Sequence, residues 1–208
     1  MKRATWYFDF ISPFAYLQWR RLRDEPRLAL DPVPILFAAV LDHVGQKGPA
    51  EIPRKRTFTY RIVHWQARRA GVPLRAPPAH PFNPMAALRL SIAAGNSPRA
   101  IDAIYTHVWA EGRQGDSAES LADVGRSLGI GDVAAAIADP AVKAQLRANT
   151  DAAIAAGIYG VPTLVIDGEY FWGNDATDMA LDFVANPGLF DDPEMRRIAE
   201  LPATASRK

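Results

Sequence analysis

The chain has 208 residues, of which 49% are hydrophobic, and this predicts one globular domain, or a domain with an insertion, with a sizeable core. The formal net charge of +1 gives no strong field for nucleic acid or membranes, and no run of about 18 apolar residues predicts a transmembrane helix. The sequence contains no cysteine, which excludes disulfides, thiolate metal sites, a cysteine nucleophile and dithiol redox chemistry carried by the protein.

The first predicted strand and helix meet at a serine. An apolar, aromatic-rich run over residues 4–10 is typical of a buried strand. It is followed by Ser12-Pro13, where serine is a preferred N-cap and proline is favoured at the first helical position. The next helix carries apolar residues at i, i+4 and i+7, namely Ala15, Trp19 and Leu22. Ser12 is therefore predicted at a helix N-terminus, where free N–H groups and the helix dipole favour an anion.

A second strand is predicted over residues 28–37. Pro32 and Pro34 place it at an edge of the sheet or shorten it, because proline cannot donate to a strand ladder. The chain thus opens as a β-α-β unit, whose parallel crossover is expected to be right-handed.

A long helical block follows. Residues 38–44 predict a short helix, and a second helix from Arg54 to Ala70 is predicted by apolar residues at i, i+4 and i+7, which are Phe58, Ile62 and Trp65. The proline-rich residues 72–84 predict an extended connector that packs through Phe82. Further helical patterns begin near Met85, Ser97, Ser117 and Pro140, and a short helix also fits residues 132–138.

The pattern then returns to strands. Residues 160–166 are rich in β-formers, Asp167-Gly168 is a strong hairpin signal, and residues 169–172 predict the return strand. A last helix is predicted after Gly173-Asn174-Asp175. We therefore expect a discontinuous domain of residues 1–37 and 157–190, a helical insertion of residues 38–156 and a C-terminal tail of residues 191–208.

This order resembles the thioredoxin fold with a helical insertion, as in DsbA-like proteins and kappa-class glutathione transferases. Residues 8–16, FDFISPFAY, resemble the start of this family, with Ser12 in place of the first cysteine of the redox motif. Residues 160–163, GVPT, resemble the loop that carries the cis-proline of the fold, and residues 173–175 resemble the glutathione-binding turn. The implied fold class is α/β, a thioredoxin-like fold with a helical domain inserted between its βαβ and ββα halves.

Two further stretches are similar to 2-hydroxychromene-2-carboxylate isomerases, which belong to the same group. They are residues 48–56, GPAEIPRKR, and residues 80–89, HPFNPMAALR. The whole resemblance runs from about residue 5 to residue 185. Two positions depart from it: Phe14 stands where the family often has tyrosine, and Gln46 stands near the place of a polar asparagine in kappa-class relatives.

The resemblance implies glutathione as a cofactor, which would supply the thiol that this chain lacks. Ser12 would then hold the glutathione thiolate rather than act as a nucleophile, whereas the residues alone also allow an ordinary N-cap. A cis Val161–Pro162 bond would let Val161 pair with the glutathione backbone, although an edge-strand proline is the alternative. The resemblance places Asn174 at the γ-glutamyl carboxylate, Asp175 at its ammonium group and Trp172 beside them, while a plain helix cap stays open for Asn174 and Asp175.

For the substrate, the resemblance implies a small aromatic carboxylate bound by Lys55 and Arg54, with further contacts from Asn83 and Trp65. Each of these residues also has a plain structural interpretation. Lys55 fits a solvated helix face, Asn83 fits a turn before Pro84, and Trp65 and Phe82 fit the hydrophobic core.

The implied function is a glutathione-dependent isomerase of the 2-hydroxychromene-2-carboxylate type, acting in aromatic degradation as a homodimer. The alternatives are a kappa-like glutathione transferase with another electrophile and a non-catalytic thioredoxin-like binding protein. The N-terminus lacks a signal-peptide cleavage pattern, so we expect a cytoplasmic protein. Four scattered histidines at no ligand spacing give no metal site, and no phosphate-binding glycine motif is present.

Overall fold

The computed structural model describes residues 1–205, and its centre is a mixed four-stranded sheet of order β2-β1-β3-β4. Strand β1 (Lys2–Phe8) runs parallel to β2 (Leu28–Pro34) and antiparallel to β3 (Thr163–Ile166), and β3 forms a hairpin with β4 (Glu169–Trp172). Strand β2 lies at an edge, as its prolines predict. The predicted tail ends in residues 206–208, which lie outside the described residues.

The helices follow the predicted order with small shifts at their ends. The first strand begins at Lys2, which pairs with Leu28, and it ends at Phe8 rather than at Phe10. The helical elements are α1 (Pro13–Leu22), α2 (Phe37–Val44), α3 (Pro53–Arg69), α4 (Met85–Ala93), α5 (Pro98–Tyr105) with a π-helical continuation (Thr106–Ala110), α6 (Ala122–Ser127), α7 (Val133–Ala138), α8 (Pro140–Ala155), α9 (Thr177–Ala185) and α10 (Pro193–Ala199). Short 3-10 turns cover Pro49–Glu51 and Leu189–Asp191.

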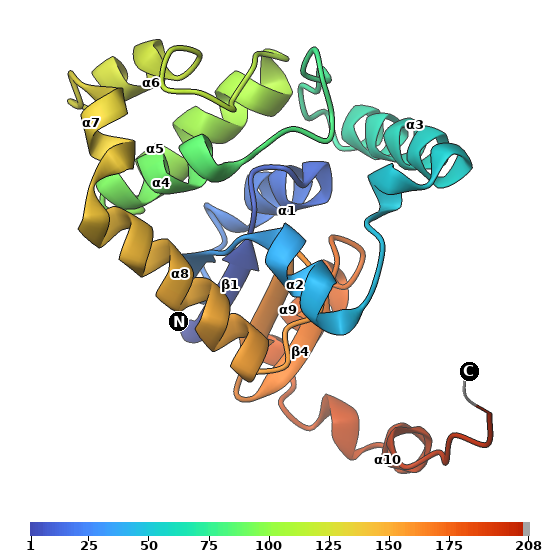
Figure 1. Cartoon of the computed structure of the whole chain (residues 1–208). Helices are drawn as coiled ribbons and strands as arrows, with labels where there is room; N and C mark the ends of the chain where they lie inside the picture. The colour runs from blue at the N-terminus through green and yellow to red at the C-terminus, as the bar shows by residue number, and fades with distance from the viewer. Residues whose placement is uncertain (206–208) are drawn as a thin grey trace.

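Figure 1 shows helices α4 to α7 gathered at one end of the molecule, while α8 runs back from them along the sheet. Helix α3 stands to one side of this group, and α10 projects from the opposite end. Within residues 1–205, no helix combines the length and the apolar character needed to cross a membrane.

One hydrophobic core joins the sheet to the helical block. Trp6 of β1 stacks on Phe8 at a centroid distance of 4.4 Å and on Trp19 of α1 at 5.4 Å. Tyr105 of α5 packs against Phe10 at 4.7 Å, so the block contributes to the core under β1. All five of these aromatic side chains are buried. The turn that follows β1 is therefore held in place by closely packed aromatic side chains of β1, α1 and α5.

Helix α3 turns its apolar stripe toward solvent, whereas the sequence pattern predicts that this stripe faces the core. Phe58 is 63% exposed and Trp65 is 54% exposed, whereas Val63 and Ala67 face the body of the protein. The interpretation of Trp65 as a core residue is therefore wrong, while that of Phe82 is confirmed, because Phe82 is buried. The error arises because periodicity shows that a helix has an apolar face but not what covers that face.

Candidate active site

Ser12 caps helix α1, as the sequence predicts. Its backbone is extended, with φ −89° and ψ 112°, and its Oγ accepts a hydrogen bond from the Ala15 N–H at 3.2 Å. The side chain is largely buried, and within the described residues its hydroxyl proton has no acceptor. The hydroxyl proton of Ser12 and the positive end of the helix dipole are thus both at the N-terminus of α1, and together they make this a site suited to an anion.

Asp9 lies beneath this turn and holds it in shape. Its Oδ1 accepts the Ile11 N–H at 3.0 Å, and its Oδ2 accepts the Phe37 N–H at 2.9 Å, so one carboxyl group joins the ends of β1 and β2. Its backbone carbonyl accepts the Ser12 N–H at 3.1 Å. Asp9 is fully buried, and this burial raises its pKa to about 7 although the N–H bonds oppose the shift. Sequence reasoning missed this role, for which the signal is one carboxylate inside an apolar run.

The buried Asp9 predicts a pH dependence of stability. Its pKa is about 7 in the folded protein against a usual value of 3.8, so between these pH values the folded chain keeps a proton that the unfolded chain has released. The free energy of unfolding should therefore fall as the pH rises through this window, on the order of 1 kcal/mol per pH unit from this group. Urea unfolding of wild type and Asp9→Asn at several pH values measures it. A difference between the two proteins that stays constant with pH would contradict the prediction.

His80 connects helix α3 to the same turn. Its Nε2 lies 2.8 Å from the Ile11 carbonyl oxygen, and its Nδ1 lies 2.8 Å from the Tyr60 hydroxyl. A carbonyl only accepts, so Nε2 carries a proton. Burial lowers the pKa of His80, which keeps the ring neutral near neutral pH, and the Tyr60 hydroxyl then shares its proton between Nδ1 and the His80 carbonyl oxygen, which lies 2.9 Å away. No role was predicted for His80, yet its ring contacts the carbonyl oxygen of Ile11, the residue directly before Ser12.

The predicted cis-proline loop reaches the sheet at the same end as Ser12. The Val161–Pro162 bond is cis, as predicted. Tyr7 pairs with Thr163 in antiparallel strands, so the residues after Tyr7 and those before Thr163 leave the sheet together. Within residues 1–205, neither the N–H nor the C=O of Val161 has a backbone hydrogen-bond partner. A loop segment whose backbone N–H and C=O have no backbone partner therefore lies at the same end of the sheet as the Ser12 turn.

Gly160 and Trp172 are packed tightly on the other side of this loop. A Cβ at Gly160 would lie 2.4 Å from the Trp172 Nε1, so no larger residue fits there without movement. The exposed Trp172 ring also meets the edge of Tyr159 at a centroid distance of 5.3 Å. The Pro162 carbonyl accepts the Gly173 N–H at 2.9 Å, which joins the loop to the turn before α9.

In that turn, Asn174 has a buried side-chain oxygen that finds no hydrogen-bond partner within the described residues. Asp175 is exposed. Unpaired buried polar atoms are rare in folded proteins and are typical of places where a ligand or water completes the bonding. This is an observation about the structure itself that fits a polar ligand at the N-terminal end of α9.

Gln18 of α1 ties this turn to the Ser12 helix. Its Nε2 donates to the Gly173 carbonyl at 3.0 Å and to the Thr177 Oγ1 at 2.9 Å. Its Oε1 accepts from the Trp6 Nε1 at 2.8 Å. The residue is fully buried and uses both ends of its amide. Gln18 was not predicted as a site residue, although it stands out in the sequence as a polar residue on the apolar face of α1.

Strand pairing and hydrogen bonds join the segments that carry six of the predicted residues, and within the described residues no such bond joins the other four to them. Ser12, Val161, Pro162, Trp172, Asn174 and Asp175 lie on segments joined by the sheet and by the bonds above. Lys55 and Arg54 are exposed on the first turn of α3, and Trp65 is exposed further along it. Asn83 is exposed, and its Oδ1 accepts the Met85 N–H at 3.0 Å, which is the local turn role that the sequence also allows.

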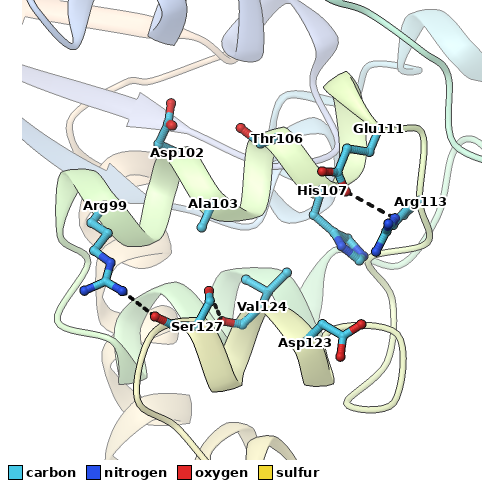
Figure 2. Close-up of a pocket in the computed structure, with 10 residues that line it drawn as sticks. All are labelled: Arg99, Asp102, Ala103, Thr106, His107, Glu111, Arg113, Asp123, Val124 and Ser127. Carbon is cyan, nitrogen blue, oxygen red and sulfur yellow. Dashed lines mark hydrogen bonds and ion pairs between the residues drawn. The ribbon is translucent and has the colours of Figure 1, made fainter.

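A separate pocket of about 450 Å³ lies between α6 and the helix formed by α5 and its π-helical continuation (Figure 2). None of the predicted site residues lines it. Its charged groups are already used: Arg99 donates to the Ser127 carbonyl, Arg113 pairs with Glu111 at 3.1 Å, and Asp102 accepts from the Trp19 Nε1 at 3.0 Å. This cleft is therefore a satisfied polar surface and not a competing candidate for the chemistry.

Comparison with known proteins shows the family to which this fold belongs. Residues 5–185 match the family described as the DSBA-like thioredoxin domain. The chain is 30% identical to a 2-hydroxychromene-2-carboxylate isomerase of Pseudomonas putida, over 83% of this chain and 89% of that protein. It is 27% identical to glutathione S-transferase kappa 2 of Caenorhabditis elegans, over 89% of this chain and 93% of that protein.

Among solved structures, a 2-hydroxychromene-2-carboxylate isomerase superposes with a TM-score of 0.78 at 24% identity. The match covers 97% of this chain and 100% of that one. With the family match, this confirms the predicted thioredoxin-like α/β fold with its additional helices.

Proposed function

The chain belongs to the DSBA-like thioredoxin domain family, and from this premise we propose that it is a glutathione-dependent isomerase. The proposed reaction interconverts 2-hydroxychromene-2-carboxylate and trans-o-hydroxybenzylidenepyruvate, or substrates of the same kind. Bound glutathione would supply a thiolate that adds reversibly to the ring-opened substrate, which allows rotation about a former double bond before elimination.

The observation that carries the proposal is the free hydroxyl proton of Ser12 at the N-terminus of α1 in a chain without cysteine. A free thiol has a pKa of about 8.5, so only a few per cent is ionised near neutral pH. Helix N-termini lower thiol pKa values, and a hydroxyl that donates to sulfur adds a charge-assisted hydrogen bond. Ser12 would therefore stabilise the thiolate without reacting itself.

The remaining residues of the region suit the rest of a tripeptide. The free N–H and C=O of Val161 would pair with the peptide backbone as an added strand does, beside Pro162 and Trp172. The Asn174 amide and the N-terminal end of α9 would hold the γ-glutamyl carboxylate, and the exposed carboxylate of Asp175 its ammonium group. The unpartnered Asn174 oxygen supports a ligand at this turn, and because an amide oxygen only accepts, it would take a hydrogen bond from the ammonium group while the Asn174 N–H groups would donate to the carboxylate.

The substrate carboxylate would be bound by cations of α3. Lys55 and Arg54 are exposed on its first turn, and Arg54 lines a hollow of about 380 Å³ together with Phe58. Guanidinium and ammonium groups both suit a carboxylate, and Arg54 suits a bidentate contact. The oxygen of Asn83 accepts the Met85 N–H at the start of α4, and its amide N–H groups, which donate to no acceptor within the described residues, would contact the substrate. Trp65, the fourth proposed contact, would offer its exposed ring to the aromatic substrate.

The proposal is tested by following isomerisation with and without glutathione. We expect the rate to depend on glutathione and the glutathione to be recovered unchanged, because elimination regenerates the thiolate. Equal rates without glutathione would overturn the mechanism.

The similarity to a kappa-class transferase makes glutathione conjugation to another electrophile the second candidate. Stoichiometric consumption of glutathione would favour that activity. A calorimetric titration that detects no glutathione binding would favour a non-catalytic thioredoxin-like protein.

A further inference from the structure

The outer face of α3 is an apolar surface that the proposed substrate contacts of Arg54 and Trp65 use only in part. Phe58, Ile62 and Trp65 follow one another at i, i+4 and i+7 on this face. Val63 and Ala67, on the other side of the helix, already serve the packing of α3 onto the body. Scattered exposed apolar residues are normal, but an ordered stripe with two large aromatic rings is typical of a contact surface.

Positive charge surrounds this stripe. Helix α3 contains six lysine and arginine residues and no acidic residue. The Arg69 guanidinium lies 4.9 Å from the centre of the Trp65 ring. Arg54 and Arg61 line the hollow of about 380 Å³ beside Phe58. Aromatic rings beside arginines are the composition enriched in the cores of protein interfaces, and the charge favours an acidic partner.

The same chain carries a segment with the matching properties. Helix α10 has no buried residue, and its apolar side chains lie at i, i+3 and i+6: Met195 is 37% exposed, Ile198 is 44% exposed and Leu201, just beyond the helix, is 59% exposed. The base of this arm is fixed, because Phe190 stacks on Phe183 at 5.3 Å. Figure 1 shows α10 projecting from the body, away from α3.

The arm is acidic where α3 is basic. Residues 191–201 contain four acids, Asp191, Asp192, Glu194 and Glu200, against two arginines, for a net charge of −2. We propose that α10 of one copy of this chain docks on the outer face of α3 of a second copy, and that the exchange is reciprocal in a two-fold dimer. The contact would bury the apolar face of each helix against the other, with complementary charge around it.

Full-length variants test this exchange by sedimentation. The face variant Phe58→Glu and the arm variant Met195→Lys/Ile198→Lys should each raise the dimer dissociation constant at least about 100-fold, because each places a charge in the apolar contact. The exposed controls Met179→Glu on α9 and Lys143→Glu on α8 should leave it unchanged. Circular dichroism would show that each variant is folded.

Mixing the two defective variants provides the decisive comparison. The face variant keeps an intact arm and the arm variant keeps an intact face, so a mixture should form a heterodimer through one remaining contact. A wild-type monomer at all concentrations, or a wild-type dimer that the arm variant leaves intact, would overturn the proposal. So would a mixture that associates no better than its separate components.

Discussion

Ser12→Ala is expected to lower the kcat/KM of glutathione-dependent isomerisation by about 10- to 100-fold, since a hydrogen bond to a charged group contributes about 1.5–3 kcal/mol. The substitution removes the hydroxyl that would donate to the sulfur but leaves the N-terminus of α1 in place. Part of the anion stabilisation should therefore survive. Steady-state kinetics at several glutathione concentrations measure the effect.

Ser97→Ala is the matched control for this substitution. Ser97 precedes Pro98, and its Oγ accepts the Ala100 N–H at 3.3 Å, so it caps α5 as Ser12 caps α1. Losing either cap should cost about 1 kcal/mol of stability. Only the Ser12 variant should lose more isomerase activity than the loss of a helix cap explains. Equal losses of activity in the two variants would mean that Ser12 acts as an ordinary cap.

Gln18→Leu is expected to have a large effect on stability. It leaves the Trp6 Nε1–H without an acceptor and removes one hydrogen bond each from the Gly173 carbonyl, which still accepts the Ala176 N–H, and from the Thr177 Oγ1, which still donates to the Asn174 carbonyl. A buried unsatisfied polar group costs about 1–3 kcal/mol, so we expect about 2–5 kcal/mol of destabilisation by urea unfolding. Gln145→Leu is the control, because Gln145 also uses its amide, to Asn149 at 2.7 Å, but on the exposed side of α8.

Gln18 also has a positioning role if the turn at Gly173–Asp175 binds glutathione. Under conditions in which the variant is fully folded, its glutathione dissociation constant should rise while kcat at saturating glutathione changes little, because the Ser12 hydroxyl is intact. Gln18→Glu keeps the acceptor for Trp6 but places an unpaired, fully buried carboxylate beside the Gly173 carbonyl, so it should destabilise the fold at least as much as Gln18→Leu does. An unchanged dissociation constant in the folded Gln18→Leu protein would limit Gln18 to a structural role.

The local patterns of the sequence predict most of the fold. The Ser12-Pro13 cap and the Asp167-Gly168 hairpin depend on neighbouring residues alone and are confirmed. The cis bond at Pro162 followed from a resemblance and is confirmed as geometry, while its contact with glutathione stays a prediction. Such features are encoded within a few residues, so they can be found without knowing the tertiary structure.

Contacts between distant residues are what the sequence leaves hidden. The bonds of Gln18 to Gly173 and of His80 to Ile11 join positions 155 and 69 residues apart. No local pattern encodes such a partner. The outward direction of Phe58 and Trp65 was missed for a related reason, because a periodic stripe indicates burial whether the covering surface belongs to the same chain or to another.

A pH titration of the thiolate absorbance of glutathione bound to wild type and to Ser12→Ala decides whether Ser12 holds a thiolate. The pKa of the bound thiol should lie below the free value of about 8.5 in the wild type and return toward it in the variant. Ser97→Ala should titrate as the wild type does. The same thiol pKa in wild type and Ser12→Ala would contradict the role proposed for this hydroxyl.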